Sequence, residues 1–155
     1  MVLKKVLFAS GSSEWATPQE VFDDLHREFQ FTLDASASAE NAKVARFYTA
    51  DDDALTQSWD GRVWCNPPYG RVVKKFLEKA VKEVSTNDRC EVIVFLLPAR
   101  TCTKWFHNYV WDERGHHPRT NVSVRFLRGR LKFGEASASA PFPSMVVVMH
   151  GGSTT

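Results

Sequence analysis

The chain has 155 residues, of which 43% are hydrophobic and 25% are charged, and its formal net charge is +2. This length fits one domain with a sizeable core. The net charge is too small to attract an anionic partner such as nucleic acid, so any such partner must be bound by a local basic patch. The three cysteines are widely spaced and odd in number, and no apolar run approaches roughly 18 residues, so we expect a reduced, cytoplasmic protein without a disulfide framework or a membrane span.

Alternating apolar runs and helical spacings predict the secondary structure. In chain order we expect a strand over 4–9, a helix over 18–29, a short buried strand over 31–34, a helical turn over 55–59, a strand over 62–65, a helix over 72–84, a buried strand over 91–97, a helix over 103–110, and strands over 122–126, 130–133 and 145–149. Residues 128–129 are predicted to be a hairpin turn. Residues 1–150 then form a single domain, and residues 151–155 form a frayed tail.

The first helix has a strong start signal. Thr17 fits the N-cap, Pro18 fits the first helical position, and Glu20 completes a capping box. The sequence therefore predicts that the Thr17 hydroxyl caps this helix.

The order of these elements predicts an α/β fold. The sheet is expected to be mostly parallel, with helices on both faces and an antiparallel hairpin at the C-terminal end. Asp34, Asn66 and Pro98 each follow or end a predicted strand. Because sites in such sheets lie at the carboxyl ends of the strands, these three residues are expected to share one crevice.

The stretch that carries the chemistry is Asn66-Pro67-Pro68-Tyr69, between a strand and a helix. The prolines make a stiff corner, the Asn66 side chain and the Pro67 carbonyl offer two acceptors, and Tyr69 offers a flat face. Such a corner suits a flat ring with an exocyclic amino group, such as adenine. Two acceptors that hold both amino hydrogens would leave the nitrogen lone pair available for a methyl group, and a base in a duplex would have to be flipped out.

At these residues the sequence resembles the small phage-type DNA N6-adenine methyltransferases, which use S-adenosylmethionine. The resemblance covers roughly residues 14–149. The matching segments are 14–18, 31–34, 39–43, 53–55, 64–70, 97–101, 126–133 and 140–144. The ordered set is much more specific than the four-residue motif alone.

The resemblance implies a Rossmann-like methyltransferase sheet and a role for each matching residue. Asn66, Pro67, Pro68 and Tyr69 would hold the target adenine in DNA. The residues implied to bind S-adenosylmethionine are Trp15, Thr17, Pro18, Asp34, Ser36 and Asp53. The segment Asp34-Ala35-Ser36-Ala37-Ser38 contains no glycine, in contrast to the glycine-rich loops of the wider superfamily.

Plainer interpretations compete with several of these roles. Asp34 can simply cap the next helix, and Trp15 can be a packing residue of the core or of a lid. A solvated loop explains at least two of the three acids at 51–53. The histidines and cysteines match no zinc pattern, so we expect no metal. Two groups of basic residues are candidates for phosphate contacts. The first lies in one loop and consists of Arg114, His116, His117 and Arg119. The second lies on the predicted C-terminal hairpin and consists of Arg125, Arg128, Arg130 and Lys132.

The sequence leaves other functions open. The same chemistry on RNA or on a protein glutamine is the nearest alternative, because the motif serves planar amino groups in general. An inactive methyltransferase-like module that grips DNA is another, supported only by the glycine-free loop. A metal-dependent nuclease that uses the acids at 51–53 and the histidines ranks last. The target sequence and the choice between monomer and homodimer are also open.

Overall fold

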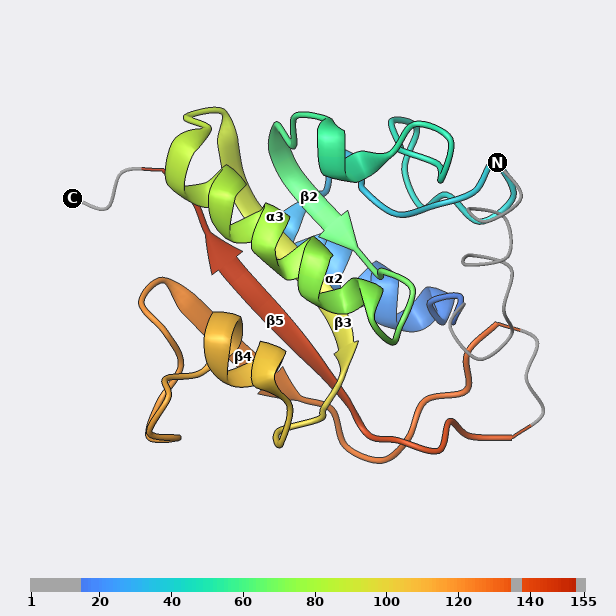
Figure 1. The fold of residues 1–155 in the computed structure, drawn as a ribbon. Helices are drawn as coiled ribbons and strands as arrows, with labels where there is room; N and C mark the ends of the chain where they lie inside the picture. The colour runs from blue at the N-terminus through green and yellow to red at the C-terminus, as the bar shows by residue number, and fades with distance from the viewer. Residues whose placement is uncertain (1–14, 135–137, 153–155) are drawn as a thin grey trace.

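The computed structural model describes residues 15–134 and 138–152, and the strand expected over 4–9 lies outside this part of the chain (Figure 1). Its helices and strands are α2 (Gln19–Phe29), β1 (Leu33–Asp34), the 3-10 turn η1 (Ala54–Thr56), β2 (Gly61–Cys65), α3 (Val72–Thr86), β3 (Cys90–Pro98), the π-helical turn η2 (Phe106–Val110), β4 (Val122–Phe126) and β5 (Ser144–His150). The predicted α/β character is confirmed. No described helix is long and apolar enough to cross a membrane.

The five strands form one sheet in the order β1-β2-β3-β5-β4. β1, β2 and β3 are parallel, whereas β5 runs antiparallel to both β3 and β4. The parallel part therefore comprises the first three strands, and two of the four pairings are antiparallel. The strands at the centre are buried on both faces, since Ile93 to Leu97 and Met145 to Met149 are at most 1% exposed.

The C-terminal hairpin differs from the prediction. Residues 130–133 form no strand, and β4 pairs with β5 instead, from Val122 opposite Met149 to Phe126 opposite Met145. The reason is burial: β5 is apolar on both faces and lies between two neighbouring strands. The Arg-Leu-Lys-Phe alternation at 130–133 has a different use, because Phe133 is buried against aromatic rings at the carboxyl edge of the sheet.

The start of α2 also differs from the prediction. Pro18 occupies the N-cap with φ −57° and ψ 133°, and no side chain caps this end. The helix therefore begins at Gln19, and the expected capping box of Thr17 and Glu20 is absent. The Thr17 side chain is buried and has another partner, described below.

The two helices pack on the sheet through aromatic side chains. Phe22 of α2 lies edge-on to Trp64 of β2, with ring centroids 5.4 Å apart. Phe76 of α3 lies 6.2 Å from the Trp59 ring. In Figure 1, α3 crosses the front of the strands, and most of α2 is hidden behind them. α2 thus packs against β2, and α3 packs against the segment that leads into β2.

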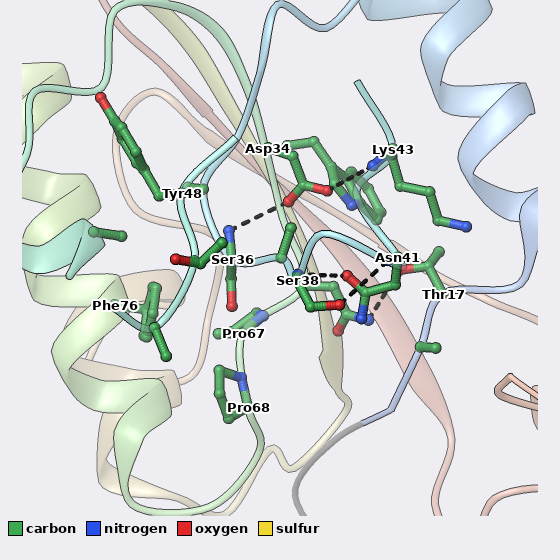
Figure 2. Close-up of a pocket in the computed structure, with 18 of the residues that line it drawn as sticks. Thr17, Asp34, Ser36, Ser38, Asn41, Lys43, Tyr48, Pro67, Pro68 and Phe76 are labelled. Carbon is green, nitrogen blue, oxygen red and sulfur yellow. Dashed lines mark hydrogen bonds between the residues drawn. The ribbon is translucent and has the colours of Figure 1, made fainter. Parts of the chain in front are cut away.

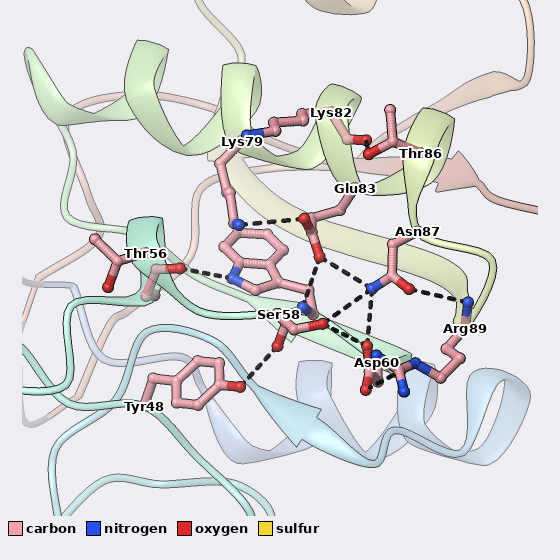
Figure 3. Close-up of polar contacts among 12 residues, drawn as sticks. Tyr48, Thr56, Ser58, Asp60, Lys79, Lys82, Glu83, Thr86, Asn87 and Arg89 are labelled. Atoms are coloured by element: carbon pink, nitrogen blue, oxygen red, sulfur yellow. Dashed lines mark hydrogen bonds and ion pairs between the residues drawn. The ribbon is translucent and has the colours of Figure 1, made fainter.

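A buried acid fastens α3 to the segment before β2 (Figure 3). The Glu83 carboxylate accepts hydrogen bonds from the Trp59 backbone N–H at 2.7 Å and the Asn87 amide at 3.1 Å, and it pairs with Lys79 at 3.2 Å. Burial tends to raise the pKa of Glu83, but these donors outweigh it, so the pKa lies below its usual value. The Trp59 indole N–H donates to the Ala54 carbonyl at 2.9 Å. This network fixes residues 54–60, which continue into β2.

Candidate active site

The carboxyl ends of β1, β2 and β3 meet at one edge of the sheet. β1 ends at Asp34, β2 ends just before Asn66, and β3 ends at Pro98. Asp34 and Asn66 line a cavity of about 800 Å³, together with Pro67 and Pro68. The expectation that Asp34, Asn66 and Pro98 share one crevice holds for the first two, whereas Pro98 is not among the residues that line the cavity. In Figure 2, Asp34 lies on one side of this cavity and the two prolines on the other, with Ser36 and Ser38 between them. A cavity of this size suits a ligand as large as a nucleoside.

The Asn66 side chain is held by the segment that precedes α2. Its Nδ2 donates one hydrogen bond to the Trp15 carbonyl and another to the Thr17 hydroxyl at 2.9 Å. A carbonyl cannot donate, so the amide atom that faces Trp15 must be the nitrogen. The orientation of the amide is therefore determined by its surroundings, and Thr17 acts as an acceptor for Asn66.

The other amide atom of Asn66 has no hydrogen-bond partner among the described residues. Oδ1 is buried and accepts no hydrogen bond from any described residue. The Pro67 carbonyl likewise accepts none within the described part of the chain. An enclosed acceptor without a donor costs about 1–3 kcal/mol, which a fold seldom retains without a use for it. Two adjacent acceptors at one stiff corner are thus available for a ligand with two N–H groups.

Asp34 shapes the loop that forms another wall of the cavity. Its Oδ1 accepts from the Ser36 N–H at 3.2 Å and its Oδ2 from the Lys43 N–H at 3.0 Å (Figure 2). The residue is 2% exposed, and this burial raises its pKa to about 6, even though the two N–H groups oppose the shift. The interpretation that Asp34 caps a following helix is therefore wrong, because no helix follows β1 directly and the carboxylate closes a loop instead.

The loop after Asp34 does not need glycine. Positive φ angles occur at none of residues 35–43, so alanine and serine adopt its backbone without strain. Ser38 and Asn41 hold it by reciprocal bonds between side chain and backbone at 2.7 and 3.2 Å. Ala37 and Tyr48 are linked through a backbone hydrogen bond of 2.9 Å. Small side chains thus leave room for a ligand in a loop with a defined shape.

The three consecutive acids have different positions. Asp52 accepts from the Thr49 N–H at 2.8 Å and the Thr49 hydroxyl at 3.1 Å, so it closes a turn. Asp51 and Asp53 both line the cavity, and their carboxylates have no hydrogen-bond partner within the described residues. Asp53 has a φ of 54°, a conformation that Asp tolerates better than most residues. Two of the three acids are thus available to a ligand.

Tyr69 is less accessible than its expected role requires. Its ring is 7% exposed, does not line the cavity, and lies edge-on to Phe142 at 5.6 Å and Phe133 at 6.2 Å. Its hydroxyl donates to the Leu96 carbonyl at 3.1 Å, and burial raises its pKa well above the usual value. Trp15 belongs to the same aromatic cluster, 5.4 Å from Phe133 and 5.2 Å from Phe142.

The remaining residues that the sequence predicted for the site differ in whether they line the cavity. Trp15, Thr17 and Ser36 line the cavity, whereas Pro18 does not, because its carbonyl begins the hydrogen bonding of α2. Many of the other lining residues had not been predicted, among them Lys43, Tyr48, Val72 and Phe76. A signal existed for the last two: they lie four positions apart on one helix face, at the N-terminal end that follows the motif.

No group of three or more His, Cys, Asp or Glu side chains that could hold a metal ion is found among residues 15–134 and 138–152. Cys65 and Cys90 are buried, Cys102 is exposed, and all three are free thiols. The cavity therefore offers amide, carboxylate and hydroxyl groups rather than a metal centre within the described part of the chain.

The sequence of this chain is similar to a family of known proteins and to individual members of it. Residues 7–151 match the model of the family described as DNA N-6-adenine-methyltransferase (Dam). A "DNA N-6-adenine-methyltransferase" of Haemophilus phage HP1 (strain HP1c1) is 32% identical over 151 residues, which cover 96% of this chain and 84% of that protein. A protein of the same name from Escherichia phage T1 is 37% identical over 95 residues, 59% of this chain and 38% of that protein. The "Putative methyltransferase YfdM" of Escherichia coli (strain K12) is 38% identical over 64 residues, 36% of this chain and 70% of that protein.

Proposed function

This chain belongs to the DNA N-6-adenine-methyltransferase family, and on that basis we propose that it transfers a methyl group from S-adenosylmethionine to the N6 amino group of adenine in DNA. The observation that carries the proposal is the Asn66 amide. Its nitrogen is fully used by Trp15 and Thr17, and its buried oxygen has no partner among the described residues. That oxygen is available for a hydrogen of the target amino group.

We propose the following roles at the reacting nitrogen. Asn66 Oδ1 accepts one amino hydrogen and the Pro67 carbonyl accepts the other, while Pro68 keeps the corner rigid. The adenine amino lone pair is normally delocalised into the ring, and two fixed acceptors favour a more tetrahedral nitrogen with an available lone pair. A nitrogen–carbon bond then forms as the sulfur–methyl bond breaks, and one amino proton leaves to solvent. Positioning and electrostatics supply most of the acceleration.

The cofactor is proposed to occupy the cavity, where it would supply an electrophilic methyl group on a sulfonium. The donor set fits such a molecule, which carries an amino acid end, a cationic sulfur and a nucleoside. Asp51 and Asp53 offer unpaired carboxylates for hydroxyl or ammonium groups, and the 35–39 backbone offers a close approach between small side chains. Trp15, Thr17, Asp34 and Ser36 also line the cavity. Pro18 is not part of this proposal, because it lies outside the cavity lining.

Asp34 should make cofactor binding pH-dependent. Its pKa of about 6 means that the carboxylate becomes protonated as the pH falls through 6, so one oxygen no longer accepts well from a backbone N–H of the loop. The fold itself gains stability as the pH falls through that range, because the pKa of Asp34 in the folded protein lies above its ordinary value of 3.8 and folding then favours proton uptake. We expect affinity for S-adenosylmethionine to fall up to about tenfold between about pH 7 and 5. Calorimetry across that range checks this.

The Asp34→Asn variant is the control for this prediction, since it cannot titrate. It should bind more weakly at neutral pH and show no step near pH 6. A step of the same size in the variant would assign the pH dependence to another group.

Stacking of the target on Tyr69 is proposed to follow a local rearrangement. The ring is enclosed by Phe133 and Phe142, so an adenine that stacks on it must displace one of them. Base–aromatic stacking contributes about 1–3 kcal/mol, which is enough to compensate for one displaced edge contact. The target base itself must be unpaired or flipped out of its duplex.

We further propose that residues 1–150 form one Rossmann-like methyltransferase domain with helices on both faces of the sheet. Support comes from β5, which ends at His150, and from α2 and α3, which pack on different parts of the strands. The phage origin of two relatives supports action in the cytoplasm of a bacterial host. The inactive DNA-gripping module loses its support, because the loop after Asp34 needs no glycine.

The test is expression in a bacterial host without adenine methylation, followed by sequencing of the methylated DNA. We expect N6-methyladenine at a defined set of sites. Purified protein with labelled S-adenosylmethionine should methylate duplex or single-stranded DNA and leave RNA and cell protein unlabelled. Labelled RNA or glutamine without labelled DNA would overturn the assignment of the substrate.

A further inference from the structure

The sheet topology separates the two basic groups that are candidates for phosphate contacts. β4 runs antiparallel to β5, so its first residue, Val122, pairs with Met149, beside the amino end of β3. The loop before it, residues 112–120, therefore joins the sheet at the edge opposite the cavity. The last residue of β4, Phe126, pairs with Met145, which in turn pairs with Leu97 at the carboxyl end of β3. Residues 127–134 thus begin at the cavity edge (Figure 1).

Residues 127–134 are held against the active site by several contacts. The Leu127 N–H donates to the Ser144 carbonyl at 3.0 Å, and the Gly134 N–H donates to the Ala16 carbonyl at 2.9 Å. Phe133 packs on both Trp15 and Tyr69. The segment is therefore fixed on Trp15 and Ala16, next to the residues that hold Asn66.

The exposed side chains of this segment are strongly basic. Arg128, Arg130 and Lys132 are exposed, form no ion pair within the described residues, and have no acid among positions 127–134. Arg100, just beyond β3, is exposed as well and stacks over the Phe142 ring at 5.5 Å. These four residues are called the basic rim. Arg125 does not belong to it, because its guanidinium makes a bidentate pair with Glu28 at 2.6 and 2.7 Å.

We propose that the basic rim binds the phosphates of DNA that flank the target base. This inference rests on the proposed function, and it assigns the DNA surface to one edge of the sheet. The overall charge of +2 cannot concentrate DNA at the site, so a local cluster must do so. Arginine and lysine on a short, anchored segment provide charge without a fixed pattern of base contacts. The loop at 112–120 is excluded from this role by its position.

The test compares two double variants that each remove two positive charges. Arg128→Ala with Arg130→Ala changes the basic rim. Lys82→Ala with Arg114→Ala removes two exposed cations: Lys82 is near the C-terminal end of α3, and Arg114 lies in the loop at the opposite edge. DNA affinity is measured by fluorescence anisotropy over a range of salt concentrations, and methylation is measured on the same DNA.

We expect the rim variant to bind DNA at least about tenfold more weakly and to lower the salt slope of log K by about 2, as for two lost phosphate contacts. Its kcat at saturating DNA and its affinity for S-adenosylmethionine should stay near the wild-type values. The methylated sites should keep the same sequence, because phosphate contacts carry no base readout. The Lys82 and Arg114 variant should bind DNA as the wild type does.

Three outcomes would overturn the proposal. Equal weakening by both variants would assign the effect to net charge, and wild-type binding by the rim variant would place the DNA elsewhere. A changed set of methylated sites would show base readout instead of phosphate contact. A wild-type enzyme that does not methylate DNA at all is a different result, because it contradicts the proposed function. Thermal unfolding of each variant confirms that the fold is retained.

Discussion

The Asn66→Ala variant should lose at least about 1,000-fold in kcat, because it removes an acceptor that the transition state needs. The expected cause is specific: only Oδ1 of this amide is available to the target, since Trp15 and Thr17 hold the nitrogen. Affinity for S-adenosylmethionine, measured by calorimetry, should change little. Methyl transfer to DNA in single-turnover reactions provides the rate.

The chain offers a matched control for this variant. Ser144 Oγ is the other buried side-chain atom without a hydrogen-bond partner among the described residues, but Ser144 does not line the cavity. Ser144→Ala should keep kcat near the wild-type value, and its stability should be equal or slightly higher because an unpaired polar atom is removed. If Asn66→Ala retained substantial activity, or if both variants lost activity alike, the role of the Asn66 oxygen would be wrong.

The Thr17→Val variant should lower kcat by about 5- to 150-fold, which corresponds to the roughly 1–3 kcal/mol cost of leaving a buried polar group without its partner. Valine has the shape of threonine but no acceptor, so one Nδ2 hydrogen of Asn66 loses its partner and the amide is free to turn. Thr17 is thus expected to act as a positioning residue through Asn66. The measurement is a full set of kcat and KM values for both substrates.

Two comparisons distinguish this role from the cofactor contact that the sequence implied. Thr17→Ser retains the hydroxyl and should restore most of kcat. If Thr17 had a purely structural role, kcat would vary with the stability of each variant and not with the presence of the hydroxyl. The affinity of Thr17→Val for S-adenosylmethionine should stay within about twofold of the wild-type value. This change is smaller than the loss of affinity expected if Thr17 made a hydrogen bond to the cofactor. A large loss of cofactor affinity with unchanged kcat at saturating cofactor would instead make Thr17 a cofactor ligand.

Local sequence signals were reliable where the chemistry of a segment decides its structure. The stiff Asn66-Pro67-Pro68 corner, the helix that follows it and the buried strand that ends at Pro98 all formed as expected. The convergence of Asp34 and Asn66 on one cavity could be predicted as well, because parallel strands place their carboxyl ends at one edge. Membership of the family also followed from the ordered motifs, and it is confirmed over residues 7–151.

The failures concern partners that lie far away in the chain. An N-cap signal at Thr17 is real, but Asn66, 49 positions later, takes the hydroxyl instead. Residues 130–133 have a strand pattern, yet β5 has greater apolar surface to bury and becomes the partner of β4. Asp51, Asp52 and Asp53 are indistinguishable in sequence, and only the turn at Thr49 separates Asp52 from the cavity.

The sequence by itself determined the α/β class, the residues of the motif and the family, because each depends on residue type and local spacing. Only the tertiary structure decided that the Asn66 oxygen has no donor among the described residues, that Tyr69 is enclosed, and that the segment after β4, not residues 112–120, begins at the cavity edge of the sheet. The physical reason is that these properties depend on competition among distant segments for the same hydrogen bonds and the same buried surface. Residue type alone does not reveal which segment wins.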